Sequence, residues 1–163
     1  MSDKMNSEFR TSRGYQILNR QEKKLTSAME DYLEMIYRLC LKNGYTRVGR
    51  LSELLHVRPS SASKMISKLA DMDCIKYERH EIILLTDSGK KIGSYLLCRH
   101  NIVEEFLQLI GSNNVLEETE LIEHSLSPST VENLNTFLEF FKSDLYADKN
   151  FRDFKKSKER MNT

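Results

Sequence analysis

The sequence predicts a mainly α-helical protein in which an N-terminal winged helix-turn-helix is followed by an all-helical domain. Three observations predict this architecture. Two short amphipathic segments, at about 48–55 and 59–72, are separated by a tight turn. Two short segments with strand character, Ile75–Tyr77 and Ile82–Leu85, then flank a polar tip in the pattern of a two-stranded wing. From Thr86 onward the apolar residues recur at helical spacing only.

The composition is that of a globular protein. The chain has 163 residues, of which 39% are apolar and 30% charged, and this length suits one domain or two small ones. It contains no apolar run long enough to span a membrane, and its first 25 residues are polar, without a signal peptide. Three cysteines without a CxxC pair favour reduced thiols. We therefore expect a cytoplasmic protein with no membrane partner.

Start and stop signals mark the first helices. Ser27 and Glu30 have the spacing of a capping box that opens a helix at Met29–Lys42, and Gly44 is placed to end this helix. Pro59 suits the first position of the second helix of the helix-turn-helix. The N-terminal part is thus expected to contain three helices before the wing.

The later helices have similar signals. Thr86 can cap a long helix that reaches about Ile110, where Gly111 ends it. Ser127-Pro128 then separates two of the remaining helices. Those helices are expected at about 115–126, 128–142 and 149–160.

Charge is divided along the chain. Residues 42–91 contain ten Lys and Arg against six Asp and Glu, whereas residues 113–148 contain eight Asp and Glu against Lys142 alone. A basic block followed by an acidic one predicts one anionic and one cationic partner. Solvated helix faces are the alternative interpretation of the same charges.

The second helix of the predicted helix-turn-helix has an outward face of small hydroxyls and lysines. Such a face suits phosphates and base edges in the major groove of double-stranded DNA. We expect His56 and His80 to be surface residues near the DNA. The residues expected to contact DNA are Arg47, Arg58, Pro59, Ser60, Ser61, Ser63, Lys64, Lys68 and Arg79.

Six residues in three separate segments have the types and spacings of a buried two-metal site. They are Asp31 and Glu34 in the first helix, His100 in the long helix, and Glu120, Glu123 and His124 in the 115–126 helix. The i,i+3 and i,i+3,i+4 spacings place each acidic set on one helix face. Four carboxylates can neutralise two divalent cations. A set rich in oxygen and free of thiolate suits Mn²⁺ or Fe²⁺ better than tetrahedral Zn²⁺.

Each part of this site also has a simpler interpretation. Paired carboxylates on a helix are most often a solvated face. Against this, Val115, Ile122 and Leu126 lie about 180° from the acidic residues of their helix, so the acidic side forms a coherent face. His100 lies at the edge of an apolar arc, where a lone histidine is more often a core residue than a ligand.

Five blocks of the sequence carry a family resemblance. They are Met29-Glu-Asp-Tyr-Leu-Glu-Met-Ile-Tyr37, Pro59-Ser-Ser-Ala-Ser-Lys-Met-Ile66, Leu85-Thr-Asp-Ser-Gly-Lys-Lys-Ile-Gly93, Arg99-His100 and Ile122-Glu-His124. Together they resemble the diphtheria toxin repressor family, and within it the manganese transport regulator branch. By this resemblance the six residues named above occupy all six metal-ligand positions. Asp31 points to the manganese branch, because iron-responsive members have a methionine there.

The resemblance implies a Mn²⁺-activated, DNA-binding transcriptional regulator that represses manganese uptake genes and has no enzymatic activity. It implies a homodimer on a palindromic operator and two Mn²⁺ per subunit, with Fe²⁺, Co²⁺ or Cd²⁺ as candidate substitutes. Three other functions stay open: an iron-responsive regulator, a metal-independent winged-helix regulator, and a di-metal hydrolase. The hydrolase is the weakest, because no separate general base or substrate pocket can be argued from the sequence.

These inferences divide the chain into four parts. They are a basic arm, mobile or weakly helical, at 1–25, a winged helix-turn-helix DNA-binding domain at 26–90, a linking helix at 91–111 and a helical dimerisation and metal-binding domain at 112–163. By the resemblance, the last part contains the dimer interface. Leu134, Phe137, Leu138 and Phe141 would form its apolar stripe, although they suit an intramolecular core equally well.

Overall fold

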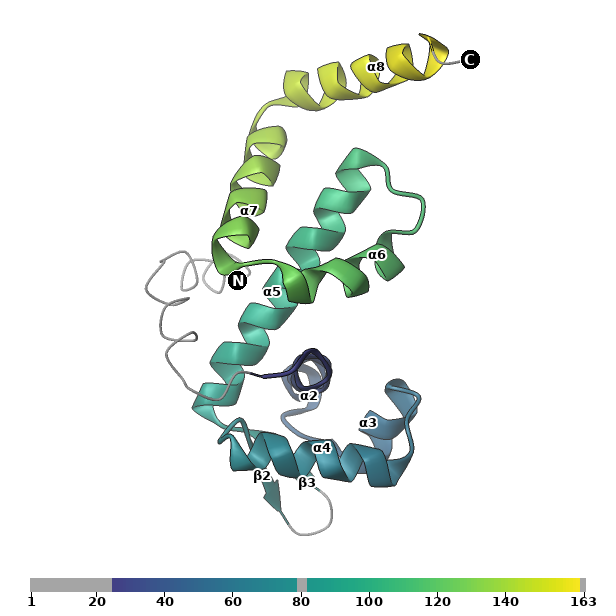
Figure 1. Cartoon of the computed structure of the whole chain (residues 1–163). Helices are drawn as coiled ribbons and strands as arrows, with labels where there is room; N and C mark the ends of the chain where they lie inside the picture. The colour runs from purple at the N-terminus through teal and green to yellow at the C-terminus, as the bar shows by residue number, and fades with distance from the viewer. Residues whose placement is uncertain (1–24, 79–81, 162–163) are drawn as a thin grey trace. The chain divides into compact units, whose positions relative to one another are not determined.

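The computed structural model describes residues 25–78 and 82–161 of the chain. These residues form two compact units, one ending at His100 and the other beginning at Asn101, and the division falls inside a single long helix. Almost all of the predicted N-terminal arm lies outside the described residues, as do Arg79 and His80. The predicted boundaries of the four parts stay a prediction. Figure 1 shows the elements in their order along the chain.

Helix α2 (Ser27–Asn43) begins the first unit. The side-chain hydroxyl of Thr26 accepts a hydrogen bond from the backbone N–H of Met29 at 3.4 Å and so caps the helix. The predicted capping box at Ser27 is wrong by one residue, because Thr26 has the extended backbone that an N-cap needs and Ser27 is already helical. Gly44 ends the helix as predicted, with a left-handed φ of 80°.

Helices α3 (Val48–Leu54) and α4 (Pro59–Asp71) form the helix-turn-helix. In the turn between them His56 has a φ of 52°, a left-handed conformation that is uncommon outside glycine. Pro59 occupies the first turn of α4, as predicted, since its missing N–H would have no partner within the helix there. The turn lets both helices bury an apolar side; Leu51 of α3 is fully buried.

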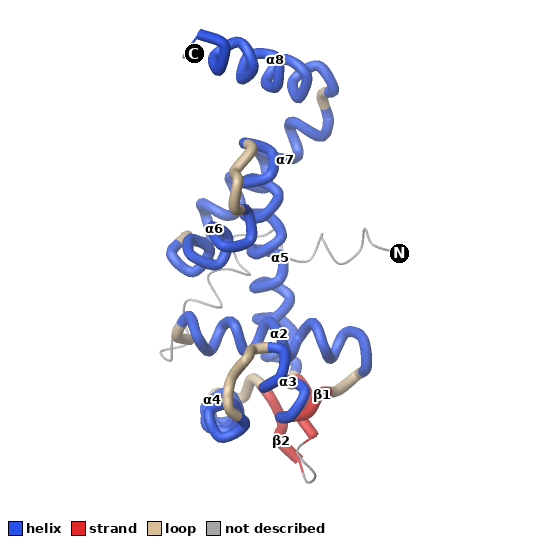
Figure 2. Tube along the Cα trace, turned by 90° about the vertical axis from the view of Figure 1, so that its right-hand side faces the viewer, coloured by secondary structure: helices blue, strands red, loops and turns tan. Residues whose placement is uncertain are grey.

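The wing consists of strands β2 (Ile75–Glu78) and β3 (Ile82–Leu85), which pair antiparallel with Tyr77 opposite Ile83. This confirms the two-stranded wing. A third strand, β1 (Thr46–Arg47), pairs with the other side of β3, so the sheet order is β1-β3-β2. Figure 2 shows these short strands together in red. The sequence did not predict β1, because two residues are too few to show the alternation that identifies a strand.

One apolar core holds the first unit together. Helix α2 packs on α4 and on β3, and α3 packs on α4. The core residues that are completely buried are Leu33, Ile36, Leu51, Ala62, Ile66, Leu69 and Ile83. Because α2 and α4 share this core, any restraint on α2 also restrains α4.

Helix α5 (Asp87–Ile110) has the two ends that were predicted. The hydroxyl of Thr86 accepts a hydrogen bond from the N–H of Gly89 at 2.9 Å. At the other end Gly111 has a φ of 80°, which suits a glycine after the last turn. The Nζ of Lys155 donates to the carbonyl of Ile110 at 2.7 Å, so this end of α5 is also held by a side chain of the second unit.

Two glycines allow the first half of α5 to pack closely against the rest of the first unit. A Cβ at Gly89 would lie 1.8 Å from the backbone oxygen of Cys74, and a Cβ at Gly93 would lie 2.7 Å from the Cβ of Tyr37. Both distances are shorter than side chains tolerate. Gly93 therefore sets how near α5 lies to α2.

The second unit contains the last part of α5 and four further elements. These are α6 (Val115–Ile122), the 3-10 turn η2 (Glu123–Ser125), α7 (Pro128–Ser143) and α8 (Leu145–Met161). The helix predicted over 115–126 is therefore an α-helix that gives way to a 3-10 turn. The helix cannot continue through Ser127, because this residue precedes Pro128 and has an extended backbone. Ser127 instead caps α7, since its hydroxyl accepts a hydrogen bond from the N–H of Thr130 at 3.2 Å.

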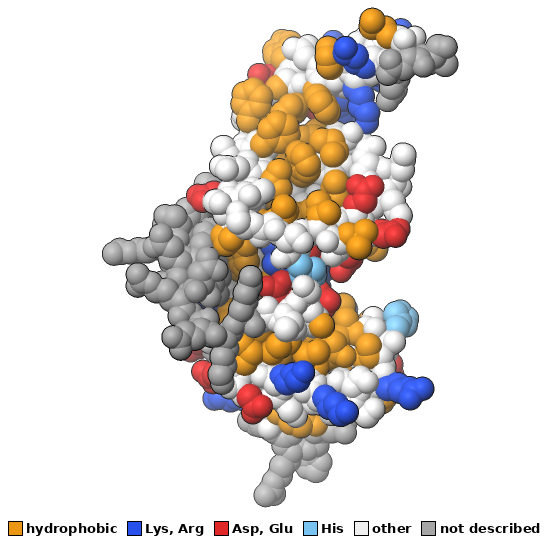
Figure 3. Space-filling view, in the orientation of Figure 1, with side chains coloured by type: hydrophobic (Ala, Val, Ile, Leu, Met, Phe, Trp, Pro, Cys, Tyr) orange, Lys and Arg blue, Asp and Glu red, His pale blue; other side chains and the backbone are white. Residues whose placement is uncertain are grey.

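Aromatic side chains connect the helices of the second unit. The ring of Phe137 lies 5.9 Å from that of Phe106 and 4.7 Å from that of Phe141, and Phe141 lies 5.7 Å from Phe151 of α8. Apolar side chains gather over this unit in the space-filling view (Figure 3). Of the predicted apolar stripe, Leu138 is 3% exposed and belongs to the core, whereas Phe137 remains 39% exposed.

None of the helices within the described residues combines the length and the apolar character needed to cross a membrane.

Candidate metal centre and DNA-binding surface

Three of the six predicted metal ligands lie in the first unit. Asp31 and Glu34 are one turn apart on α2, and His100 is the last residue of the unit, on α5. Glu34 is only 9% exposed and His100 only 5%, while Asp31 is half-buried. This burial differs from the solvated acidic face that was the simpler interpretation of α2.

Glu34 has a cationic neighbour on its own helix. Arg38, one turn further along α2, donates to Oε1 of Glu34 from Nε at 2.9 Å and from Nη2 at 2.6 Å. Arg38 is not among the site residues predicted from the sequence, although its i,i+4 spacing from Glu34 is the signal for such a pair. The pair fixes the direction of the Glu34 carboxylate.

The other three predicted ligands lie in the second unit. Glu120 is on α6, whereas Glu123 and His124 are in η2. The prediction that all three share one α-helix is therefore wrong, because the α-helix ends at Ile122. The 3-10 turn still keeps Glu123 and His124 adjacent to the end of α6.

Burial separates these three residues. Glu123 is only 1% exposed, His124 is half-buried and Glu120 is exposed. Thr119 is buried beside them and its hydroxyl donates to the carbonyl of Val115 at 2.8 Å. Polar residues, rather than only apolar ones, thus occupy the buried side of α6 and η2.

The donor chemistry of the six residues fits a hard divalent cation. They offer four carboxylates and two imidazoles, which suit Mn²⁺ or Fe²⁺, and no thiolate. Burying a carboxylate as deeply as Glu123 is costly unless a cation or hydrogen-bond donors compensate its charge. Burial raises the pKa of the Cys98 thiol, and so disfavours the thiolate that would bind a metal near His100.

The expected DNA-binding residues lie on the outer side of the helix-turn-helix. Arg58 precedes the first turn of α4, and Arg47, at the end of β1, has its guanidinium carbon 6.0 Å from the ring centroid of Tyr45. Ser63 is partly buried. The other described members of the set, together with Arg47 and Arg58, are exposed: Pro59, Ser60, Ser61, Lys64 and Lys68. Because these side chains are exposed, this face of α4 is accessible to a partner.

Two family models match the chain one after the other. The N-terminal DNA-binding domain of iron-dependent repressors matches residues 24–81, and their metal-binding and dimerisation domain matches residues 86–152. The chain belongs to the iron-dependent repressor family. The predicted resemblance to the diphtheria toxin repressor family is thereby confirmed, and so is the prediction of a metal-dependent, DNA-binding transcriptional repressor rather than an enzyme. Its domains are those of a regulator that binds DNA and dimerises.

Relatives within the iron-dependent repressor family are similar over most of the chain. The HTH-type transcriptional regulator MntR of Oceanobacillus iheyensis is 42% identical over 133 residues, which are 80% of this chain and 88% of that protein. MntR of Bacillus subtilis is 37% identical over 139 residues, or 84% of this chain and 98% of that protein.

Solved structures of the family have the same fold. The structure of the manganese regulator SloR superposes with a TM-score of 0.61 at 30% identity, and covers 69% of this chain. A structure of ScaR with bound Zn²⁺ has a TM-score of 0.58 at 30% identity, and also covers 69% of this chain. In both comparisons the chain spans 54% of the solved protein, about half of its length.

Proposed function

We propose that this protein is a Mn²⁺-activated repressor of manganese uptake genes. The observation that carries the proposal is the burial of Glu34, His100 and Glu123 within a ligand set that contains oxygen and imidazole donors only. Buried charges of this kind are expected where a cation binds. The proposal is supported by relatives such as SloR, which is described as a manganese regulator.

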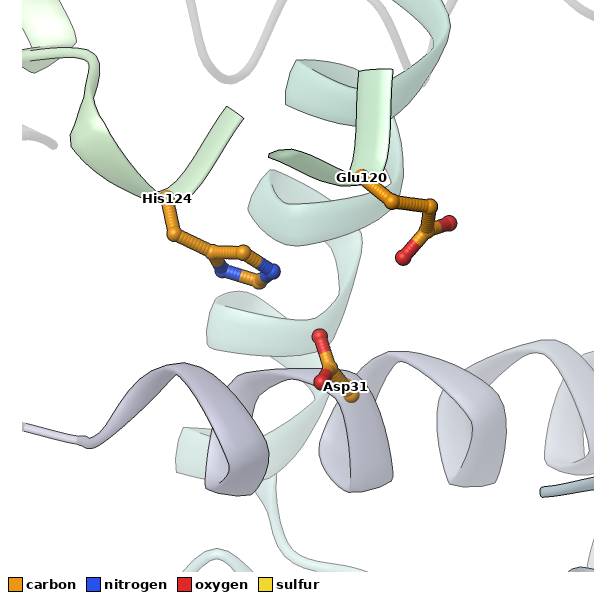
Figure 4. Close-up of side chains that lie close together, drawn as sticks. All are labelled: Asp31, Glu120 and His124. Atoms are coloured by element: carbon orange, nitrogen blue, oxygen red, sulfur yellow. The ribbon is translucent and has the colours of Figure 1, made fainter. Parts of the chain in front are cut away.

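We propose two metal ions per subunit, each held by two carboxylates and one imidazole. Asp31, Glu120 and His124 would form one group, and their side chains are drawn in Figure 4. The second group would consist of Glu34, His100 and Glu123. Together the two groups would supply four carboxylates, which balance the charge of two divalent cations. Fe²⁺, Co²⁺ and Cd²⁺ are candidate substitutes because they accept the same donors.

The arrangement of the ligands along the chain suggests how metal binding reaches the DNA. When bound, the metal supplies positive charge that the four carboxylates share. The carboxylates of α2 and those of the second unit repel one another without it, and are drawn together with it. Because α2 and α4 share one core, a restraint on α2 would also restrain α4.

A fixed α4 in each subunit matches the geometry of a palindromic operator. In a dimer the two α4 helices would enter successive major grooves only when their spacing is right. Metal binding that restricts the two α4 helices to this spacing would favour the binding-competent state. A coupling free energy of about 1–3 kcal/mol, typical of allostery, would change DNA affinity by about 5- to 150-fold.

DNA contacts are proposed for the exposed face of α4 and its surroundings. Arg58, Lys64 and Lys68 would contact phosphates, and Arg47 would add charge beside them. Arg79, which lies outside the described residues, is a further proposed contact. The hydroxyls of α4 would lie towards base edges. Pro59, Ser60, Ser61 and Ser63 complete this proposed set.

The proposal is tested by DNA binding of the purified protein to its own upstream region, measured by fluorescence anisotropy with a chelator and then with Mn²⁺. We expect Mn²⁺ to tighten binding of the wild type. Glu123→Gln is nearly isosteric but neutral, so it should abolish the response while the dimer persists in sedimentation. Glu118→Gln removes an exposed carboxylate of the preceding helix α6 and should leave the response intact. Equal affinity of the wild type in chelator and in saturating Mn²⁺ would refute the metal-sensor function.

A further inference from the structure

A buried ion pair joins α2 to α5 next to the proposed ligands of the first unit. Nη2 of Arg99 donates to Oε2 of Glu30 at 2.9 Å. The Arg99 side chain is 4% exposed and that of Glu30 is 19% exposed. Glu30 immediately precedes Asp31, and Arg99 immediately precedes His100. The pair therefore links the two helices at the level where each of them carries a ligand.

Arg99 is also held from the side of its own helix. Its guanidinium carbon lies 6.0 Å from the ring centroid of Tyr95, one turn earlier on α5, and Tyr95 is itself buried. A planar guanidinium that contacts both a ring and a carboxylate has few orientations left. The pair is therefore a well-defined contact rather than a fluctuating surface bridge.

A second contact fixes the same two helices. Gly93 of α5 lies so close to Tyr37 of α2 that a Cβ there would be 2.7 Å from the Cβ of Tyr37. One contact alone would act as a pivot about which α5 could turn. The ion pair lies six residues further along α5 and seven residues earlier on α2, and so removes this freedom.

We propose that Glu30 and Arg99 are positioning residues for the metal centre. Their ion pair sets the place of His100 relative to Asp31 and Glu34 before a metal binds, and so raises metal affinity. This inference rests on the proposed function, because it takes these three residues as ligands. Ligands held in place by neighbouring groups bind a metal more tightly, since binding no longer has to order them. Arg99 itself cannot be a ligand, because a guanidinium remains protonated and has no acceptor.

The test uses the full-length protein and four variants: Glu30→Gln, Arg99→Met, the double variant, and Arg99→Lys. Calorimetry gives the Mn²⁺ affinity, the visible absorption of bound Co²⁺ reports ligand geometry, and urea unfolding of the metal-free protein reports stability. We expect each single neutral substitution to weaken Mn²⁺ binding by about 10-fold or more, as the loss of supporting contacts does in other metal sites. The double variant should be no weaker than the weaker single variant, because both remove the same contact.

The sign of the Arg99→Met effect separates positioning from simple electrostatics. Removing a positive charge beside a cation site would by itself tighten Mn²⁺ binding. Loss of positioning weakens it and changes the Co²⁺ spectrum. Arg99→Lys keeps the charge but loses the planar fork, so its affinity should lie between those of Arg99→Met and the wild type. Glu105→Gln breaks the exposed Lys142–Glu105 pair and serves as the matched control, with no expected change in metal affinity.

The possible results distinguish this inference from the function on which it depends. A wild type that binds no Mn²⁺ would refute the proposed function. A wild type that binds Mn²⁺, with Arg99→Met or Arg99→Lys binding it equally well or more tightly, would refute the positioning role alone. The same holds if the variants lose stability in urea but keep the metal affinity and Co²⁺ spectrum of the wild type, because a purely structural pair would behave in that way. If Arg99→Met does not fold, Arg99→Lys decides by the same criteria. Glu30→Gln then contributes its Co²⁺ spectrum, because removing a negative charge beside a cation site would by itself lower the Mn²⁺ affinity.

Discussion

Two arginines close to the proposed ligands, Arg38 and Arg99, donate hydrogen bonds to carboxylates and cannot bind a metal themselves. Arg38 donates twice to Glu34, and Arg99 pairs with Glu30. A guanidinium keeps its charge at any pH at which a protein is folded, so it holds a carboxylate without competing as a ligand. In the proposed site, carboxylates and imidazoles would bind the metal and guanidinium groups would orient them.

Asp31→Met tests metal choice at the residue scale. A thioether is a softer donor than a carboxylate, so the substitution should weaken activation by Mn²⁺ and favour Fe²⁺ or Co²⁺. Titration of DNA binding with each metal measures the order of activation before and after the change. An unchanged order would remove Asp31 from the proposed ligand set. Asp87→Asn, at an exposed carboxylate of α5, is the control and should keep the wild-type order.

Residue types and spacings were enough to predict the candidate ligands, but not their surroundings. Glu30 and Arg99 are 69 residues apart, and the sequence alone contains no sign that they meet. A buried site was predicted, but not that Glu123 is the most deeply buried of the six residues, because a carboxylate at the end of an amphipathic helix normally faces solvent. Contacts of this kind depend on how helices pack, which local sequence does not specify.

At the scale of elements, helix α2 combines two roles that are usually separate. Its apolar side forms part of the core with α4 and β3, and its other side carries Asp31 and Glu34. The local signals for such elements were strong where a single residue controls the backbone, as Gly44, Pro59 and Gly111 do. They failed for β1, which is too short, and for the end of α6, which depends on the next helix cap.

Gly93→Ala tests the close approach of α5 to α2. The added methyl group would have to displace Tyr37, and overpacking of this kind costs about 1–3 kcal/mol of unfolding free energy. Urea unfolding measures the loss. The control is Gly49→Ala in α3, where a Cβ would meet nothing within 4 Å, and where the gain in helix propensity should stabilise the protein by about 0.5–1 kcal/mol. Equal stability of Gly93→Ala and wild type would contradict the close contact.

Lys64→Ala tests the role of α4 in DNA binding. If Lys64 contacts a phosphate, its loss should weaken binding to all sequences similarly and reduce the slope of log affinity against log salt by about one unit. Metal affinity should be unchanged, because Lys64 is not near the proposed ligands in sequence. Lys156→Ala, at an exposed position of α8, should leave the slope as it is. A loss confined to one base pair would instead identify Lys64 as a base-reading residue.

At the scale of the whole molecule, the two units have separate stabilising contacts. The first has a continuous apolar core, while the second depends on the aromatic contacts among α5, α7 and α8 and on helix caps. Burial also raises the pKa values of Cys40, Cys74 and Cys98, so at neutral pH these thiols react slowly with alkylating reagents. Because their stabilising contacts are separate, the two units are expected to unfold in separable transitions.

Mn²⁺ should couple the unfolding of the two units if the proposed groups, Asp31 with Glu120 and His124, and Glu34 and His100 with Glu123, bind it. At a free concentration of 100 times its dissociation constant, one bound ion stabilises the folded state by about 2.7 kcal/mol. Calorimetric unfolding should show separable transitions of the two units in chelator, and a single transition at higher temperature with Mn²⁺. A shift of one transition only would mean that the metal binds within one unit.

The unbroken course of α5 has a further consequence, which concerns length rather than chemistry. The helix has 24 residues, and its division between the units falls at His100. Each residue added after that point would advance everything downstream by about 1.5 Å and rotate it by about 100°. An insertion of seven residues would nearly restore the original phase, to within about 20°. A change in the length of this helix would therefore preserve the direction of its downstream residues only when it is close to a whole number of turns.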